Sequence, residues 1–218
     1  MPAADPATDL VLVEHQGPVA VVTINRPAKY NAISPAVVTA LDAALGALGA
    51  DPRVRAIILT GAGKAFAAGA DISFYAQADR EEFTAFTGRC NALCDRIATS
   101  PVPVVAAVRG LALGGGFELV LSCDVVVAEQ GAAFGLPEVS LGLLPGWGGT
   151  QRLTWHVGPN RAKWLIMSGE RLDATTAEAL GIVTHICDTD ALLPVALRVA
   201  DALAAQSPRR PSPRFERP

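Results

Sequence analysis

Three consecutive glycines with a glutamate close behind them are the residues of this chain best placed for chemistry. Gly114–Gly116 separate an apolar strand pattern, Val104–Val108, from a helical pattern that we expect to begin near Phe117 and to carry Glu118 in its first turn. Glycines leave the backbone open to a ligand, and the first N–H groups of a helix have no partner inside it. The stretch therefore predicts a site for negative charge.

Two interpretations of Glu118 stand on this local pattern. A carboxylate in the first turn stabilises the positive end of a helix dipole. The same carboxylate beside open backbone amides would also be placed for catalysis. A second glutamate, Glu138, ends the turn Phe134–Glu138. Taken alone, the position of Glu138 after Pro137 indicates a solvated turn residue.

Composition limits the classes of function. The chain has 218 residues, 50% hydrophobic and 18% charged, with a net charge of −3. That length fits one domain with a short appendage, and the charge excludes nucleic acid or an anionic membrane surface as an expected partner. We find no apolar run that could span a membrane and no leader peptide in the opening residues.

No metal site is expected. The four cysteines, at positions 90, 94, 123 and 187, follow no metal-ligand spacing, and we interpret them as reduced thiols in a cytoplasmic protein. The three histidines, at 15, 156 and 185, are interpreted as structural.

Strand and helix patterns alternate along the chain, which predicts an α/β fold. A hairpin is expected from Leu10–Val13 and Val19–Ile24, and a helix capped by Ser34 from Pro35 to about Ala47. The further expected strands are Val54–Thr60, Val104–Val108, Asp124–Ala128 and Ile182–Ile186, and the further expected helices are 79–99, 150 onward, 159–168, 174–180 and 189–205.

Four blocks of this sequence resemble the enoyl-CoA hydratase/isomerase (crotonase) family. They are Asn25-Arg-Pro with Asn31-Ala32; Gly63–Ile72; Gly110–Leu119 with Cys123-Asp124; and Phe134–Leu153. Alone, the small-residue stretch Gly61–Ile72 would read as a tight surface loop. Four blocks in the family's order make the resemblance specific over residues 9–205.

The resemblance implies the family's fold, a crotonase-like spiral of ββα units with C-terminal helices packed on it, assembled as a homotrimer or dimer of trimers. We accordingly divide the chain into a flexible N-terminus (1–8), a spiral core (9–158), a helical C-terminal region (159–206) and a disordered tail (207–218). The amphipathic pattern ends near Ala205. The helical region is therefore shorter than is usual in the family, which leaves oligomer strength, closure of the acyl site and level of activity open.

The family's reaction centre is carried over by position. Members act on acyl-CoA thioesters, and two backbone N–H groups hold the thioester oxygen; these resemble the amides of Ala70 and Gly115. Glu118 and Glu138 match the two acids with which hydratases activate water. No cofactor is implied, because coenzyme A is part of the substrate.

Further residues resemble the family's substrate contacts. The loop Ala28, Lys29 and Tyr30 and the backbone at Ala68, Asp71 and Ile72 match the part that grips coenzyme A, although Lys29 also reads as an ordinary exposed lysine. Gly146 matches a small residue near the acyl group, with Trp147 shaping that pocket or filling core space.

Three hypotheses remain from the sequence. Both acids are present, which favours a hydratase that converts a trans-2-enoyl-CoA to a 3-hydroxyacyl-CoA. A double-bond isomerase using the same enolate is the second. The shortened C-terminal region prompts the third, an inactive acyl-CoA-binding or subunit-interaction protein.

Overall fold

Two β-sheets, one larger and one smaller, form the frame of the molecule. The computed structural model describes residues 9–206, and the predictions for 1–8 and 207–218 lie outside them. The larger sheet contains, in spatial order, β1 (Val11–Gln16), β2 (Val19–Ile24), β3 (Ala56–Gly61), β5 (Val104–Val108), β7 (Val125–Glu129) and β10 (His185–Cys187). The smaller contains β4 (Ala65–Ala67), β6 (Leu111–Leu113), β8 (Ala133–Gly135) and β9 (Leu172–Asp173).

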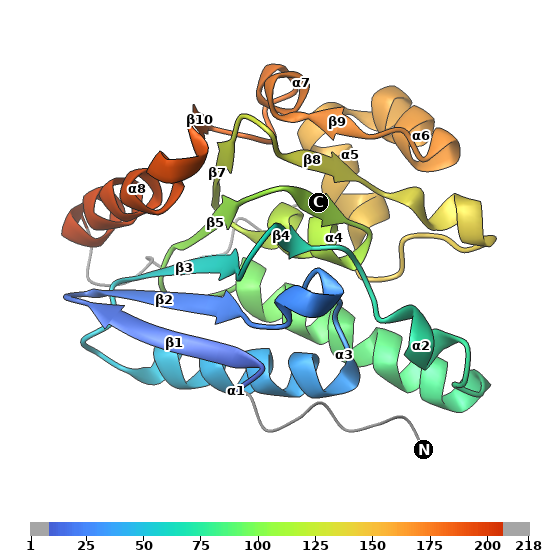
Figure 1. Cartoon of the computed structure of the whole chain (residues 1–218), viewed down its shortest axis with the longest axis horizontal. Helices are drawn as coiled ribbons and strands as arrows, with labels where there is room; N and C mark the ends of the chain where they lie inside the picture. The colour runs from blue at the N-terminus through green and yellow to red at the C-terminus, as the bar shows by residue number, and fades with distance from the viewer. Residues whose placement is uncertain (1–8, 207–218) are drawn as a thin grey trace.

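The chain winds between these sheets as a spiral (Figure 1). Each turn gives one strand to the larger sheet, then one to the smaller, and then a helix: β3–β4–α3, β5–β6–α4 and β7–β8–α5. The successive strands of each sheet pair in parallel from β2 to β10 and from β4 to β8. The predicted α/β spiral of ββα units is confirmed.

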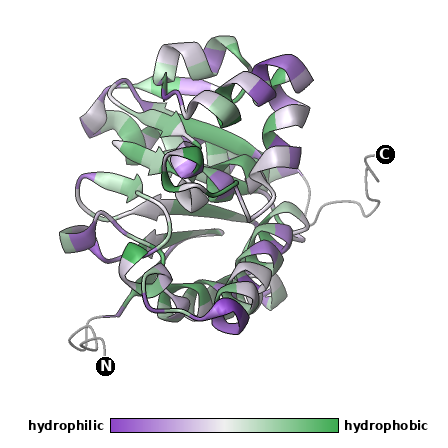
Figure 2. Ribbon diagram, turned by 90° about the vertical axis from the view of Figure 1, so that its right-hand side faces the viewer, coloured by the Kyte–Doolittle hydropathy of each residue, from purple (hydrophilic) through white to green (hydrophobic). Residues whose placement is uncertain are grey.

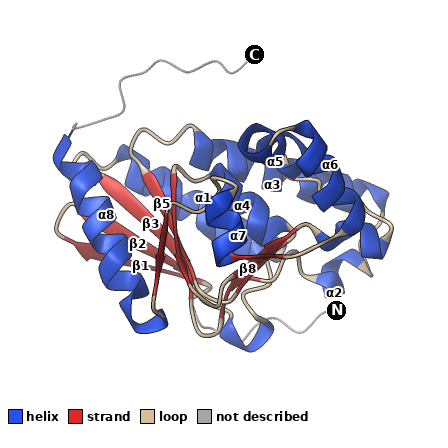
Figure 3. Cartoon of the chain, turned by 90° about the horizontal axis from the view of Figure 1, so that it is seen from above, coloured by secondary structure: helices blue, strands red, loops and turns tan. Residues whose placement is uncertain are grey.

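Helices cover both faces of the larger sheet, as Figure 3 shows. On one face lie α1 (Pro35–Ala50), α3 (Arg80–Ala98) and α4 (Gly115–Ser122), and on the other lies α8 (Leu192–Gln206). Strands buried on both faces need apolar residues at consecutive positions, which explains β5, all of whose residues are buried. In Figure 2 the strands in the interior of the molecule are coloured mainly as hydrophobic.

Residues 159–206, expected to be helical, also complete both sheets. Their helices are α6 (Pro159–Ser168), α7 (Ala174–Ala179) and α8, and they follow α5 (Gly149–Val157). β9 pairs with β8, and β10 pairs with β7. No helix within residues 9–206 is long and apolar enough to cross a bilayer.

Local signals located most elements well. The Ser34 hydroxyl accepts from the Val37 N–H at the start of α1, as the Ser-Pro pair predicts. Several elements differ from prediction, α4 and β10 among them. α4 begins at Gly115 and not near Phe117, because helical geometry continues through two glycines that propensity alone disfavours. β10 begins at His185, three residues later than predicted, since pairing with β7 and not apolarity decides its register.

Asn31 joins its own loop to the loop between β3 and β4. Its side chain is fully buried, accepts from the Arg26 N–H at 2.9 Å, and donates to the carbonyls of Ala62 and Ala65 at 2.9 and 2.7 Å. Its backbone is left-handed, with φ of 57°, which asparagine tolerates better than most residues. All three of these hydrogen bonds are made by the side-chain amide of Asn31.

We expect Asn31→Ala to lower the free energy of unfolding by about 3 kcal/mol, because it leaves buried backbone groups unpaired. Urea denaturation measures this change. The exposed Asn160→Ala serves as the control and should stay within about 0.5 kcal/mol of wild type. Equal stability of the two variants would contradict the assignment.

Candidate active site

A strained glycine corner opens helix α4. Gly114 follows β6 with φ of 51° and ψ of −127°, outside the regions open to residues with a side chain. Its N–H donates to the Gly135 carbonyl and its own carbonyl accepts from the Glu118 N–H, both at 2.9 Å. The corner is thereby fixed between the smaller sheet and α4, and the Gly115 N–H belongs to the first turn, where helical amides have no partner within the helix.

A second corner follows β4. The Gly69 carbonyl accepts from the Ile33 N–H at 2.8 Å, and the Asp71 N–H donates to the Ile33 carbonyl at 2.9 Å. Ala70 is the bridged residue between them. In a parallel bridge of this kind the polar groups of the central residue point to the opposite side. The Ala70 N–H is therefore turned away from Ile33.

The structure brings these two corners into contact. A Cβ built on Gly69 would lie 3.2 Å from the Leu113 carbonyl oxygen and 4.0 Å from the Gly114 Cα, and one built on Gly114 would lie 3.8 Å from the Gly69 Cα. Gly69 also has a positive φ of 111°. A side chain at Gly69 would crowd the Leu113 carbonyl, so the backbones of the two corners, next to Ala70 and Gly115, lie side by side.

Glu118 is held rigidly beside this site. Its side chain is buried, and Oε1 accepts from the backbone N–H groups of Trp147 and Gly149, both at 2.7 Å. Burial raises the pKa of Glu118 to about 7, against the opposing effect of these two hydrogen bonds. The nearby Glu138 raises it further and Arg152 lowers it. A carboxyl group with this pKa can both take and give a proton near neutral pH.

Glu138 also lies against the Gly114 corner. It stands in the first turn of η2 (Pro137–Leu141), and its Oε1 would lie 3.0 Å from a Cβ on Gly114. Its Oε2 is buried, and no group within the described residues hydrogen-bonds it. Burial raises the pKa of Glu138. An unpaired buried oxygen of this kind is expected to have a ligand or water as its partner.

Glu118 links the stability of the fold to pH. Its pKa is about 7 in the folded chain against an ordinary 4.5, so between these values the folded state holds a proton that the unfolded chain has released. The free energy of unfolding must then fall as pH rises. We expect wild type to lose about 3 kcal/mol relative to Glu118→Gln across this window.

Urea denaturation at a series of pH values measures that difference. Glu178→Gln, at an exposed position on α7, provides the matched control and should follow wild type throughout. A wild-type curve parallel to that of Glu118→Gln would show that Glu118 has an ordinary pKa.

Arg152, which was not predicted as a site residue, stabilises the loop that holds Glu118. The buried Arg152 of α5 donates to the Trp147 carbonyl at 2.8 Å and pairs with Asp95 of α3 at 2.6 Å. It therefore fixes the corner whose N–H groups hold Glu118. Asn91 of α3 holds the same corner by donating to the Gly146 carbonyl at 2.5 Å. The only sequence signal was that Arg152 lies within the block Phe134–Leu153.

The residues predicted to contact coenzyme A lie on two loops. Ala28, Lys29 and Tyr30 lie on or next to η1 (Pro27–Lys29) and are exposed, and the Tyr30 carbonyl accepts from the Ala68 N–H at 3.0 Å. The two predicted binding loops are thus adjacent. Ile72 is also exposed, at the start of α2 (Ile72–Tyr75).

The Asp71 side chain is engaged within the protein. It pairs with Arg26 at 3.1 Å and accepts from the Ser73 N–H at 3.0 Å, capping α2. Burial acts to raise the pKa of Asp71, but the hydrogen bonds from Ser73 and Arg26 outweigh it and lower the pKa. The Asp71 side chain thus caps α2 and pairs with Arg26 within the protein.

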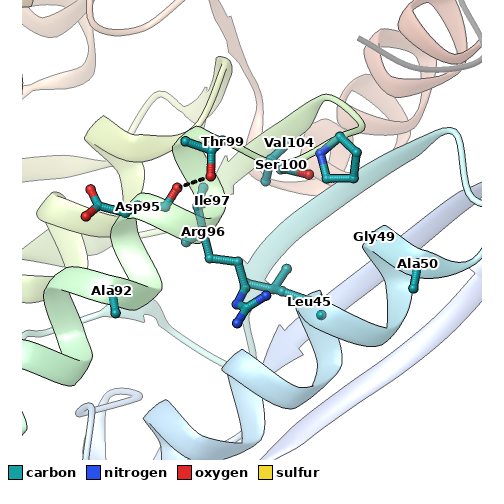
Figure 4. A pocket seen from close by; sticks show the side chains of 12 residues that line it. Leu45, Gly49, Ala50, Ala92, Asp95, Arg96, Ile97, Thr99, Ser100 and Val104 are labelled. Carbon is teal, nitrogen blue, oxygen red and sulfur yellow. Dashed lines mark hydrogen bonds between the residues drawn. The ribbon is translucent and has the colours of Figure 1, made fainter. Parts of the chain in front are cut away.

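A cavity of about 470 Å³ lies elsewhere, in the groove between α1 and α3. In Figure 4 the Arg96 side chain extends into it toward α1, where Arg96 pairs with Asp42. None of its lining residues belongs to either glycine corner, and neither glutamate lines it. The reaction centre is therefore defined by its chemical groups and not by this cavity. Within residues 9–206 no cluster of residues suitable for a metal ion is present.

Comparison with known proteins fits this geometry. The family profile described as Enoyl-CoA hydratase/isomerase matches residues 14–211. The chain belongs to this family. A probable enoyl-CoA hydratase of Rhizobium meliloti is 44% identical, the match covering 91% of this chain and 77% of the relative. A short-chain-enoyl-CoA hydratase of Clostridium acetobutylicum is 42% identical, over 91% of this chain and 76% of the relative.

Solved structures of family members share the fold. The enoyl-CoA hydratase of Bacillus anthracis superposes with a TM-score of 0.89 at 36% identity, covering 91% of this chain and 78% of that one. An enoyl-CoA hydratase subunit of Geobacillus kaustophilus gives 0.86 at 44% identity, covering 91% and 77%. The chain thus spans about three quarters of the length of these family members.

Proposed function

We propose that this chain is an enoyl-CoA hydratase, which adds water across the C2–C3 double bond of a trans-2-enoyl-CoA to give a 3-hydroxyacyl-CoA. One observation carries the proposal. The buried carboxyl group of Glu118 and the half-buried one of Glu138, both with raised pKa, lie near the Gly114 corner, and the buried Glu138 Oε2 has no hydrogen-bond partner within the described residues. The hydratase relatives support the same activity.

The thioester oxygen is assigned to the N–H groups of Ala70 and Gly115. Negative charge develops on that oxygen when water attacks C3 and the electrons of the double bond move toward the carbonyl. Fixed donors about 2.7–3.1 Å from such an oxygen stabilise the enolate more than the substrate. The contact between the Gly69 and Gly114 corners supports this role, as does the position of Gly115 at the N-terminus of α4.

The two glutamates divide the proton transfers. The ionised carboxylate takes a proton from water while the water oxygen bonds to C3, and the protonated carboxyl gives its proton to C2 as the enolate collapses. Close carboxyls in a dry site favour one proton shared between them, so their titration belongs to the pair. Water and thioester balance the reaction, and we assign no metal or redox cofactor to it.

Coenzyme A binding is assigned to the two adjacent loops. Ala28, Lys29 and Tyr30 would contact the adenine and phosphates together with the backbone of residues 68–72, with Gly146 near the acyl group. The hydrogen bond between Ala68 and Tyr30 and the exposure of Lys29 support this placement.

We also propose assembly as a homotrimer or dimer of trimers. Exposed apolar side chains on η2, the loop after it and α6 support association; they are Leu141, Leu144, Trp164 and Met167. Light scattering after size exclusion measures the mass, and a monomer at micromolar concentration would refute the assignment.

Turnover of trans-2-enoyl-CoA tests the proposed activity. A hydratase removes the absorbance of the conjugated thioester, and mass spectrometry shows the gain of one water. A product of unchanged mass with a shifted alkene would identify an isomerase. Binding without turnover across a panel of acyl lengths would identify an acyl-CoA-binding protein.

A further inference from the structure

An exposed carboxylate on α3 stands at the end of a chain of contacts that reaches Glu118. Asp95 accepts a hydrogen bond at 2.6 Å from the guanidinium of Arg152, which also donates to the Trp147 carbonyl at 2.8 Å. The Trp147 N–H in turn donates to the Glu118 Oε1 at 2.7 Å. Side chains from α3, α5 and α4 are therefore connected through one loop residue.

The loop of residues 147–149 is shaped around this guanidinium. A Cβ built on Gly148 would collide with the Arg152 Nη1, and Gly148 has a positive φ of 93°. The Gly148 carbonyl accepts from the Arg152 backbone N–H at 2.9 Å. The guanidinium thus packs on the turn that presents the N–H groups of Trp147 and Gly149 to Glu118, so its position sets theirs.

The two partners of the ion pair differ in exposure. The Arg152 side chain is 9% exposed, whereas the Asp95 side chain is 70% exposed. Arginine keeps its positive charge in proteins, and this charge lowers the pKa of Glu118. Asp95 supplies the opposite charge next to the guanidinium. Without Asp95, the buried positive charge would favour the ionised form of Glu118 more strongly.

The other titratable groups whose charges act on Glu118 are Glu138 on η2, Tyr75 on α2, and Cys90 and Cys94 on α3. Burial raises the pKa of Tyr75 and Cys94 to about 12 and also raises that of Cys90, so these three are uncharged near neutral pH. Glu138 is the proposed partner in the reaction and not a fixed charge. The fixed charge behind Glu118 is therefore set by the ion pair between α3 and α5.

We propose that Asp95 is a positioning residue of the reaction centre, which acts through Arg152 to hold the 147–149 loop against Glu118 and to offset the positive charge behind it. This inference rests on the proposed function, in which Glu118 and Glu138 share one proton and the protonated carboxyl gives it to C2. Loss of the Asp95 charge would leave both acids ionised at lower pH, and the proton donor would then be missing.

Asp95→Asn tests the proposal, because its amide oxygen can still accept from Arg152 although the charge is gone. We expect the alkaline limb of the pH profile of kcat to move down by about half a pH unit or more. Above that limb kcat should fall about threefold or more, with KM little changed. Asp95→Glu keeps the charge and should restore the wild-type profile.

Asp42→Asn is the matched control, because it removes a carboxylate from the exposed ion pair with Arg96, the residue next to Asp95 on α3. Neither partner of that pair belongs to the 147–149 loop or contacts Glu118 in the hydrogen bonds described above. The control variant should keep the wild-type profile.

Urea denaturation measures the same shift without substrate. The pH window in which wild type loses stability relative to Glu118→Gln should end at a lower pH when both chains carry Asp95→Asn. The proposal is overturned if this window and the kcat profile both stay unchanged in Asp95→Asn, or if Asp42→Asn or Asp95→Glu shifts them equally. A shifted window in a chain that hydrates no enoyl-CoA would refute the hydratase proposal alone.

Discussion

Glu138→Gln should lower kcat for hydration by about 10²–10⁴ while changing KM little, because the amide cannot exchange the proton that the reaction moves. The fold should tolerate the change, since the Glu138 Oε2 makes no hydrogen bond within the described residues. Steady-state rates with a four-carbon trans-2-enoyl-CoA measure the effect, and thermal unfolding confirms that the variant is folded.

Two further variants sharpen this result. Glu118→Gln should lose a similar factor, and the double variant should be little worse than either single one, because groups that act as a unit are not additive. The exposed Glu178→Gln should match wild type. Normal turnover by both single variants would remove the basis of the hydratase proposal.

Gly115→Ala should lower kcat by about 10²–10³, the usual effect of losing one oxyanion donor. A methyl group there would overlap the Trp147 ring, so the backbone at 115 must shift and carry its N–H out of line with the thioester oxygen. Stopped-flow or steady-state hydration rates, with binding of butyryl-CoA measured in parallel, separate the loss of rate from a loss of affinity.

The control for this variant is Gly88→Ala. Gly88 lies on α3 with no atom within 4 Å of a built Cβ, so the alanine should keep full activity and slightly stabilise the helix. Adding Trp147→Ala to Gly115→Ala removes the overlap and should recover part of the lost rate. Full activity in Gly115→Ala alone would exclude this amide as a donor.

Local sequence signals were sufficient for most of the spiral. The strand β5 needed only its five apolar residues, and α3 was expected from the helical pattern over residues 79–99. Such signals act between near neighbours in the chain and are readable from one sequence. β4 was missed because three residues in a small-residue stretch carry no periodicity, and its partner β6 lies more than forty positions away.

For the reaction centre, motif resemblance named the residues and the tertiary structure decided their state. Nothing in the sequence shows that Glu118 accepts from residues 147 and 149, that Arg152 braces that corner through Asp95, or that the Asp71 side chain is occupied by Arg26. Each depends on burial and on contacts between distant segments. A pKa near 7 or an indole against Gly115 is set by these surroundings, and a linear pattern of residue types does not contain them.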